Sequence, residues 1–555
     1  MRLDLHAADA AYSPAPPMRA ARRARPDAVE WAALAVFAAL SLWTLGLDLG
    51  QVIAHGRVWT GTDGTYITDQ MQYLAWIRGA SHHLLVPNLF VLRSTPADYF
   101  QPAVVISGAL TALGMAPWLA LLLWKPVAVV SLWLAFRAYV HRTVPGRLGR
   151  RAALILALFF GSYTLVYGQW GVVGDMMPGF LSWGYTFGLL ALALMVFALV
   201  RYERARERGE ITVVPGVLGA IAALLHPWHG ELFVVVLVGA EAALWWLAKP
   251  RRRPPLGLAV LTVGLTGAAL LYYEILGRAD KSWELARVAS KHGGFPLWTV
   301  ALAAAPLLVP AALAWRAPQR TFGQIATRVW PVATLIIWVL SASALSATPL
   351  HAVQGLTLPL GVLAVQGVAR LRLDRAPRMR LAAVPAIALL TVPGTIKLMQ
   401  EGKQLASPTY NNANFIAKPE RAALRYLAHT PDRGGVLARP YLGLVVPALT
   451  DRNTFVGDCL WSEPGCSQRV NATQALFSGS MAPGQARAFV RATGARFLLS
   501  DCKQAAELSH VLGSMLLSVH RFGCATVYEL ADPAKPTGPL AESGRYAAVR
   551  PSWRQ

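Results

Sequence analysis

The polar stretch Thr68-Asp-Gln-Met-Gln-Tyr73 holds residue types that could do acid–base chemistry. A carboxylate can take the proton from an acceptor hydroxyl, and it can help to hold a divalent cation. Asp69 and Gln70 are adjacent, and Tyr73 lies one helical turn further. The three side chains can therefore face one cavity. The alternative is that Asp69 caps a short helix or only solvates the loop.

A second candidate carboxylate, Asp175, stands in Gly168-Gln-Trp-Gly-Val-Val-Gly-Asp-Met-Met-Pro178. Asp69 and Asp175 come from separate polar loops. Two such carboxylates can share a metal ion, or one can act as base while the other orients the substrate. The alternative is that Asp175 is an acid in a solvated turn.

The segment His226-Pro-Trp-His-Gly-Glu231 places two imidazoles and a carboxylate close together in the chain. Such a cluster could bind zinc or contact a phosphate. Pro227 breaks a helix, so the spacing of His226, His229 and Glu231 does not guarantee a common face. A purely structural role is the alternative.

A third loop, Gly277-Arg-Ala-Asp-Lys-Ser-Trp283, is basic, with Arg278 and Lys281. Cations here suit a lipid phosphate, and Trp283 offers a face that can stack on a sugar ring. The alternative is an amphipathic helix with ion pairs one turn apart. His351, in Thr348-Pro-Leu-His-Ala-Val-Gln354, is a further polar candidate for substrate binding.

The composition predicts the elements that position these residues. Of the 555 residues, 55% are hydrophobic and only 15% are charged, whereas soluble domains carry about 25% charged residues. A disordered chain is excluded, and a polytopic α-helical membrane protein remains. The net charge is +23, but the arginines form short runs between apolar segments. Arginine runs in this position are typical of the cytoplasmic loops of a membrane protein. They do not indicate a nucleic-acid-binding face, so we expect no nucleic-acid partner.

Eleven apolar segments approach the length of a membrane crossing, about 20 residues. We expect them near residues 31–51, 117–140, 152–168, 184–200, 213–228, 231–248, 257–275, 297–315, 329–346, 355–370 and 381–399. Arginine runs mark every second loop, which puts the N-terminus in the cytoplasm. Residues 101–115 are expected to form a separate interfacial helix. The apolar run 31–53 is too long for a signal peptide.

The pattern predicts three parts: a basic cytoplasmic tail at 1–28, a transmembrane module at 29–400 and an extracytoplasmic soluble α/β domain at 401–555. Short strands are expected near 435–439, 496–499 and 526–530, and helices near 419–429 and 483–493.

All four cysteines, Cys459, Cys466, Cys502 and Cys524, lie in the soluble part, which suggests two disulfides in an oxidising compartment. Three pairings are open, and proximity favours Cys459–Cys466 with Cys502–Cys524. Four buried thiols are the alternative.

The arrangement resembles the GT-C superfamily of multi-pass glycosyltransferases that use lipid-phosphate sugars. The likeness rests on Asp69 in the first outer loop, Tyr99-Phe-Gln-Pro102, Asp175 in the second outer loop and a soluble C-terminal domain. The stretch 450–462, Thr-Asp-Arg-Asn-Thr-Phe-Val-Gly-Asp-Cys-Leu-Trp-Ser, also looks like a segment of such enzymes.

The resemblance implies a polyprenyl-phosphate sugar donor and a glycan, lipid or protein acceptor in the cell envelope. Asp69 would be the general base of a single displacement that inverts the anomeric carbon. Tyr99 and Gln101 would lie at the substrate, and Arg278 and Lys281 would hold the leaving phosphate. Many relatives carry an acidic pair where this chain has Asp69-Gln70. A divalent cation, Mg or Mn, therefore stays open, and its ligands are unknown.

Two other functions compete with a glycosyltransferase. A flippase or transporter of lipid-linked sugars would need charged groups near the membrane midplane and repeated halves. A scaffold whose soluble domain binds a partner would explain the cysteines but leaves Asp69, Asp175 and the basic loop without a role.

Overall fold

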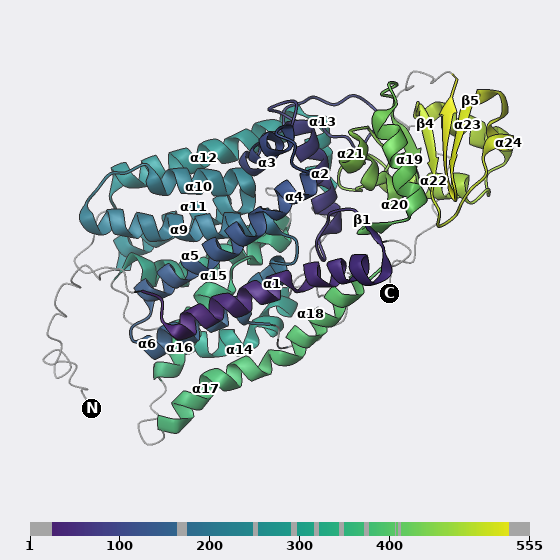
Figure 1. Ribbon diagram of the computed structural model, residues 1–555. Coiled ribbons are helices and arrows are strands. Elements are labelled where there is room, and N and C mark those ends of the chain that lie inside the picture. The colour runs from purple at the N-terminus through teal and green to yellow at the C-terminus, as the bar shows by residue number, and fades with distance from the viewer. Residues whose placement is uncertain are drawn as a thin grey trace, which may run out of the picture.

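The computed structural model describes residues 25–531 except 162, 164–174, 248–253, 290–296, 316–320, 343–348, 371–376, 406 and 409–411. Most of these residues form a bundle of long helices, and a small sheet lies beyond one end of it (Figure 1). The basic tail predicted at 1–28 falls almost wholly outside the described residues, as do most of the loop before Asp175 and the stretch after 531.

Eight helices of the described chain are long and apolar enough to cross a membrane, which makes this a multi-pass membrane protein. They cover Ala28–His55 (α1), Pro117–Thr143 (α4 and α5), Thr186–Arg208 (α9), Pro227–Trp246 (within α11, Pro227–Leu247), Leu256–Ala279 (α12), Leu297–Trp315 (α14), Phe322–Ser341 (within α15, Phe322–Ala342) and Ala382–Gln404 (from α17, Pro377–Leu390, and α18, Val392–Leu405).

Three of the eleven expected crossings are helices shorter than the roughly 20 residues that a membrane crossing needs. The helices α6 (Arg147–Phe159), α10 (Val214–Leu225) and α16 (Thr357–Arg370) have 13, 12 and 14 residues. At 1.5 Å per residue a helix of this length spans about 20 Å, less than the hydrocarbon thickness. The reason is clearest for α10, which starts with a proline in its first turn and stops just before Pro227.

Short elements gather at the end of the bundle that faces the sheet (Figure 1). Among them are β1 (Val58–Trp59), α2 (Ile67–Ala80), α3 (Pro102–Ala112) and α13 (Lys281–Ala289). Two further short elements, α8 (Pro178–Leu181) and the 3-10 turn η2 (Pro349–Val353), lie close to the start of α2, because Thr65 N donates to Trp183 O and both Tyr66 and His351 contact Asp175. Helix α3 is the separate helix expected at 101–115. These elements lie in the connections between the long helices. Residues far apart in the sequence therefore meet at this end of the bundle.

The C-terminal region, residues 415–531, is an α/β unit. Its sheet has the order β3-β4-β6-β5, with β3 parallel to β4 and the other neighbours antiparallel. The strands are β3 (Val436–Ala438), β4 (Phe497–Ser500), β5 (Leu516–Phe522) and β6 (Ala525–Leu530), and the helices are α19 (Lys418–His429), α20 (Pro440–Gly443), α21 (Val445–Thr450), α22 (Cys466–Phe477), α23 (Pro483–Thr493) and α24 (Ser509–Leu512), with a 3-10 turn η3 (Gly513–Met515). Five of these elements coincide with the segments expected from sequence, whereas β5 was missed.

The cysteines form the two favoured disulfides. Cys459 bonds to Cys466 and Cys502 bonds to Cys524, with Cα–Cα distances of 5.3 Å and 4.8 Å. The first bond ties the loop after α21 to the start of α22, and the second ties the end of β4 to the turn between β5 and β6. The expected pairing is confirmed.

A two-stranded ribbon joins the helical bundle to the C-terminal region. Strand β1 pairs antiparallel with β2 (Phe415–Ile416), and Val58 lies opposite Ile416. Hydrogen bonds between buried polar groups lie next to this ribbon. Thr62 Oγ1 donates to Asn414 Oδ1 at 2.5 Å, and Asn414 Nδ2 donates to Asp48 Oδ1 of α1 at 3.4 Å. The loop that precedes α2 is therefore held from both sides.

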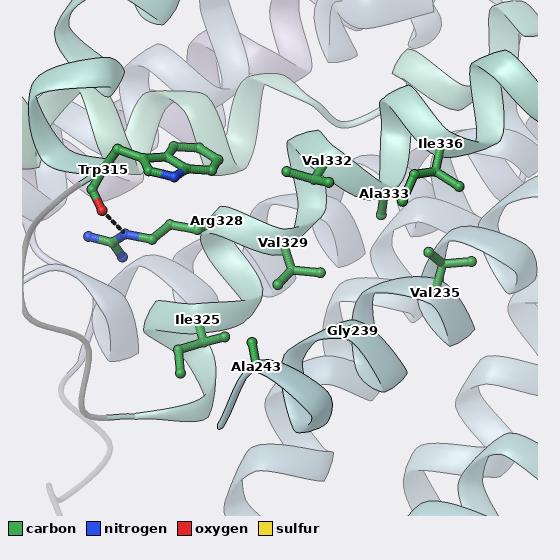
Figure 2. A pocket seen from close by; sticks show the side chains of 10 residues that line it. All are labelled: Val235, Gly239, Ala243, Trp315, Ile325, Arg328, Val329, Val332, Ala333 and Ile336. Carbon is green, nitrogen blue, oxygen red and sulfur yellow. Dashed lines mark hydrogen bonds between the residues drawn. The ribbon is translucent and has the colours of Figure 1, made fainter. Parts of the chain in front are cut away.

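One groove in the bundle lies between α11, α15 and the end of α14, with a volume of about 320 Å³. Its lining is apolar except for Arg328 (Figure 2). That guanidinium donates to the backbone oxygens of Ala314, Trp315 and Gln324 at 2.9, 3.3 and 2.8 Å, so it caps the end of α14. The groove holds none of the predicted site residues.

Candidate active site

Helix α2 carries Asp69 in its first turn. Asp69, Tyr73 and Trp76 are spaced four and three residues apart, which puts them on one face of α2. Gln70 is placed differently. Its Oε1 accepts from Asp63 N at 2.8 Å and its Nε2 donates to Asp63 O at 2.6 Å, so its amide fixes the preceding loop.

Asp175 and His351 meet although 176 positions separate them in the chain. His351 Nδ1 lies 3.0 Å from Asp175 Oδ2, and Tyr66 donates a long hydrogen bond of 3.5 Å to Asp175 Oδ1. This pair acts on Asp69. Burial raises the pKa of Asp69 to about 6, the charge of His351 lowers it and the charge of Asp175 raises it. The structure thus brings both candidate carboxylates together.

His226 and His229 join the same group. Their Nδ1 atoms lie 2.9 Å apart, and the ring centroids of His226 and His351 are separated by 4.9 Å. Tyr185 OH contacts the other nitrogen of His226. Both side chains are buried, and in the described part of the chain His229 Nε2 and the neighbouring Trp228 Nε1 have no hydrogen-bond partner. A buried polar atom without a partner is costly, and a ligand in the site would satisfy it.

Glu231 lies in α11, close to these histidines in sequence, with its side chain partly exposed. No described group of three His, Cys, Asp or Glu side chains could hold a metal ion. The divalent cation considered from the sequence stays a prediction, and its ligands stay unknown.

An aromatic cluster extends the site along α2. It consists of Tyr73, Trp76, Tyr99, Trp283 and Trp461. Trp76 lies 4.2 Å from Tyr99 and 5.4 Å from Trp461, centroid to centroid, and Trp283 lies 4.7 Å from both Tyr99 and Trp461. Such packing joins α2, α13 and the C-terminal region.

Gln101 lies at the start of α3 beside the aromatic cluster. Its Nε2 donates to Leu225 O at 3.3 Å. Its buried Oε1 has no partner in the described residues. Gln101 therefore connects the start of α3 to the end of α10.

Arg278 and Lys281 are not brought to Asp69. Their side chains are 76% and 61% exposed. Arg278 pairs with Glu274 at 2.6 Å and Lys281 pairs with Glu284 at 2.8 Å. These are ion pairs one turn apart, the alternative arrangement considered for this segment.

Three groups near the site were not singled out from the sequence. Asp458 is buried, and its pKa is raised to about 7 by burial and by the charge of Asp69. Asp63 forms a buried ion pair with Lys125 of α5, whose Nζ also donates to Ser182 O at 2.8 Å. The sequence does contain a signal for the Asp63–Lys125 pair, because a lysine within an apolar membrane segment needs a buried partner.

The arrangement offers one half-buried carboxyl with a raised pKa beside an aspartate–histidine pair. It lies where the helical bundle meets the C-terminal region. A base with these properties can accept a proton from a hydroxyl near neutral pH.

Comparison with family models and with curated proteins finds no match to this sequence. Solved structures do match its fold. The oligosaccharyltransferase of Archaeoglobus fulgidus in the apo form has a TM-score of 0.54 at 14% identity, covering 87% of this chain and 71% of that one. The same enzyme, AglB, in complex with an inhibitory peptide and a dolichol-phosphate has a TM-score of 0.51 at 14% identity, with 87% and 70% covered.

A lower TM-score of 0.48 at 14% identity relates the chain to ArnT from Cupriavidus metallidurans bound to undecaprenyl phosphate, with 92% and 100% covered. From the match to the oligosaccharyltransferase, the fold of this chain is GT-C-like.

Proposed function

We propose that this protein is a membrane glycosyltransferase that moves a sugar from a polyprenyl-phosphate donor to a cell-envelope acceptor. The observation that carries the proposal is the placement of Asp69 beside the Asp175–His351 pair, at the junction of a GT-C-like bundle and its C-terminal region. The related AglB structure holds a dolichol-phosphate and a peptide, which supports a lipid carrier and a separate acceptor.

In this mechanism Asp69 takes the proton of the acceptor hydroxyl as the oxygen attacks the anomeric carbon. The new glycosidic bond forms while the bond from that carbon to the phosphate oxygen breaks, and the polyprenyl phosphate leaves with the electron pair. Configuration inverts because there is one displacement. The raised pKa of Asp69 makes the carboxylate a stronger base than an exposed one.

The histidine group next to Asp175 is suited to bind the donor. Trp228 Nε1 is a buried donor without a partner in the described chain, and His229 Nε2 is a second unpaired nitrogen. We assign both to polar contacts with the phosphate or the sugar. Arg278 at the end of α12 and Lys281 at the start of α13 are exposed, so both are accessible to a lipid phosphate at the surface of the bundle.

The acceptor belongs to the compartment that holds the C-terminal region. We assign this region to the extracytoplasmic side, because the arginine-rich loops favour a cytoplasmic N-terminus and disulfides need an oxidising compartment. The protein then resides in the cell membrane. A glycan, a lipid or a protein hydroxyl on that side would serve as acceptor.

The decisive experiment measures transfer from a panel of radiolabelled polyprenyl-phosphate sugars by purified protein in detergent. We expect product from one donor with wild type, and a loss of about 10²-fold or more with Asp69→Asn, since a general base contributes 10²–10⁴-fold. Glu210→Gln, an exposed acid at the turn after α9, is the matched control and should keep full activity.

Each other outcome has a distinct meaning. Equal product from wild type and Asp69→Asn would keep the enzyme class and reject Asp69 as base. No product from any donor and acceptor by folded protein would reject the proposal. A flippase would then remain, and it predicts movement of a fluorescent lipid-linked sugar across vesicles without product.

A further inference from the structure

The segment Gly457–Ser462 of the C-terminal region reaches the helical bundle. Ser462 Oγ donates to Phe90 O at 3.0 Å, and Asn88 Nδ2 donates to Trp461 O at 2.9 Å. Phe90 and Asn88 belong to the long connection between α2 and α3. Hydrogen bonds at two successive residues hold this segment against the part of the bundle that carries the site.

Trp461 extends the contact to α2 itself. Its ring packs edge-on against Trp76 at 5.4 Å and against Trp283 at 4.7 Å. Trp76 lies two turns beyond Asp69 on the same face of α2. The buried Trp461 Nε1 has no partner among the described residues. The segment therefore lies against the face of α2 from which Asp69 projects.

The segment has little freedom to move. A Cβ at Gly457 would lie 2.6 Å from Gly443 O, so the backbone packs directly on α20. Asp458 Oδ1 accepts from Leu460 N at 2.9 Å, which fixes the carboxyl group in the turn. The next residue, Cys459, is bonded to Cys466 at the start of α22. The Cys459–Cys466 disulfide therefore restrains the turn that carries Asp458.

Asp458 is buried three residues before Trp461, and it lies near enough to Asp69 for the two negative charges to repel each other. Burial and the negative charge of Asp69 raise the pKa of Asp458 to about 7, while the pKa of Asp69 is raised to about 6. The other titratable groups acting on Asp69 are Asp175 before α8 and His351 in η2, and Tyr66 and Tyr73 lie beside it. Two carboxyls that repel each other in this way titrate as a pair, and the raised pKa of Asp458 favours its protonated form.

We propose that Asp458 is a further residue of the active site, a neutral carboxylic acid that donates a hydrogen bond to the bound substrate while Asp69 receives the acceptor proton, and that the Cys459–Cys466 disulfide positions it. Asp458 keeps its proton through the reaction, so the displacement stays balanced. This inference rests on the proposed glycosyltransferase function. It makes the C-terminal region part of the catalytic machinery, dependent on one disulfide.

The first test compares Asp458→Asn with Asp458→Leu in the full chain. We expect wild-type transfer to rise through about pH 6 and to fall above about pH 7 as Asp458 ionises. The amide of Asp458→Asn donates at every pH, so this variant should keep activity and lose the alkaline decline. Asp458→Leu removes the donor and should cost about 10²-fold in kcat. Wild-type rates in Asp458→Leu, or an unchanged alkaline limb in Asp458→Asn, would overturn the proposal.

The second test contrasts the two disulfides. We expect Cys459→Ser with Cys466→Ser to lower kcat about tenfold or more, because small misplacement of a catalytic group is costly. The matched control, Cys502→Ser with Cys524→Ser, should stay within about twofold of wild type at a temperature where both variants are folded. Equal losses in both pairs would contradict a positioning role.

These tests separate the two proposals. Product from wild type and from the control pair keeps the glycosyltransferase assignment whatever the Asp458 variants do. Absence of product from wild type with every donor rejects that assignment itself. If a serine pair does not purify as a folded protein, the pH profiles of the two Asp458 variants decide alone.

Discussion

At the scale of single residues, Asp69 is set between groups that act on its charge in opposite directions. His351 lowers its pKa and Asp175 raises it, while burial keeps it at about 6. His351 also lies 3.0 Å from Asp175, so one imidazole both orients the second carboxylate and moderates the first. The pKa of this proposed base is therefore set by residues from two distant loops.

Substitution of His351 by glutamine tests this tuning. The amide keeps a hydrogen-bond donor near Asp175 but removes the charge that favours ionised Asp69. The pKa of Asp69 should then rise, and because the base acts when deprotonated, the acidic limb of the kcat/KM profile should move to higher pH. The control is His83→Gln, an exposed histidine after α2. A limb that moves to lower pH would contradict the assignment.

At the scale of elements, the loop before α2 is fixed by a buried ion pair. Lys125 of α5 contacts Asp63, Thr44 Oγ1 donates to the same carboxylate at 3.0 Å, and Gln70 bonds to the Asp63 backbone at 2.6 and 2.8 Å. The pairing of β1 with β2 also attaches this loop to the start of the C-terminal region. These contacts determine where α2 starts and hence where Asp69 lies.

The buried pair makes a stability prediction. Lys125→Met leaves Asp63 buried without its cation, and breaking such a pair costs about 3–5 kcal/mol. The double variant Lys125→Met with Asp63→Asn removes both charges and should recover much of that loss. Thermal unfolding of the purified proteins in one detergent measures both. Equal melting temperatures for the single and double variants would show that the charge of Asp63 is not what destabilises the single one.

At the scale of the whole molecule, the bundle and the C-terminal region meet at the candidate site. Aromatic rings from both parts pack together in the aromatic cluster. The pairing of β1 with β2 is a second contact between the bundle and the C-terminal region. Figure 1 shows α2 and β1 between the long helices and the α20–α21 segment. A site built across this junction works only if both parts stay docked.

Cysteine labelling in intact cells tests the proposed orientation. The four native cysteines are disulfide-bonded, so one introduced cysteine is a unique free thiol. Ser480→Cys lies exposed in the C-terminal region and Glu210→Cys lies exposed after α9. We expect a membrane-impermeant maleimide to label the first in intact cells and the second only after permeabilisation. The reverse pattern would place the C-terminal region in the cytoplasm.

Local patterns alone predicted much of this protein. Apolar length predicts which segments are helices of a membrane bundle, because a buried helix in lipid must be apolar along its whole length. Alternation and proline positions located β3, β4, β6, α19 and α23, and short separations predicted the disulfides. These features depend on neighbours in the chain, so sequence carries them directly.

Only the tertiary structure decided which side chains share the site. His351 meets Asp175 across 176 positions, and the segment that carries Asp458 reaches α2 through the packing of Trp461 on Trp76. Arg278 pairs with Glu274 at the surface and not with a group beside Asp69. No local spacing specifies such partners. They follow from how helices and loops pack, since a charge or hydrogen bond is satisfied by whichever group packing brings within reach.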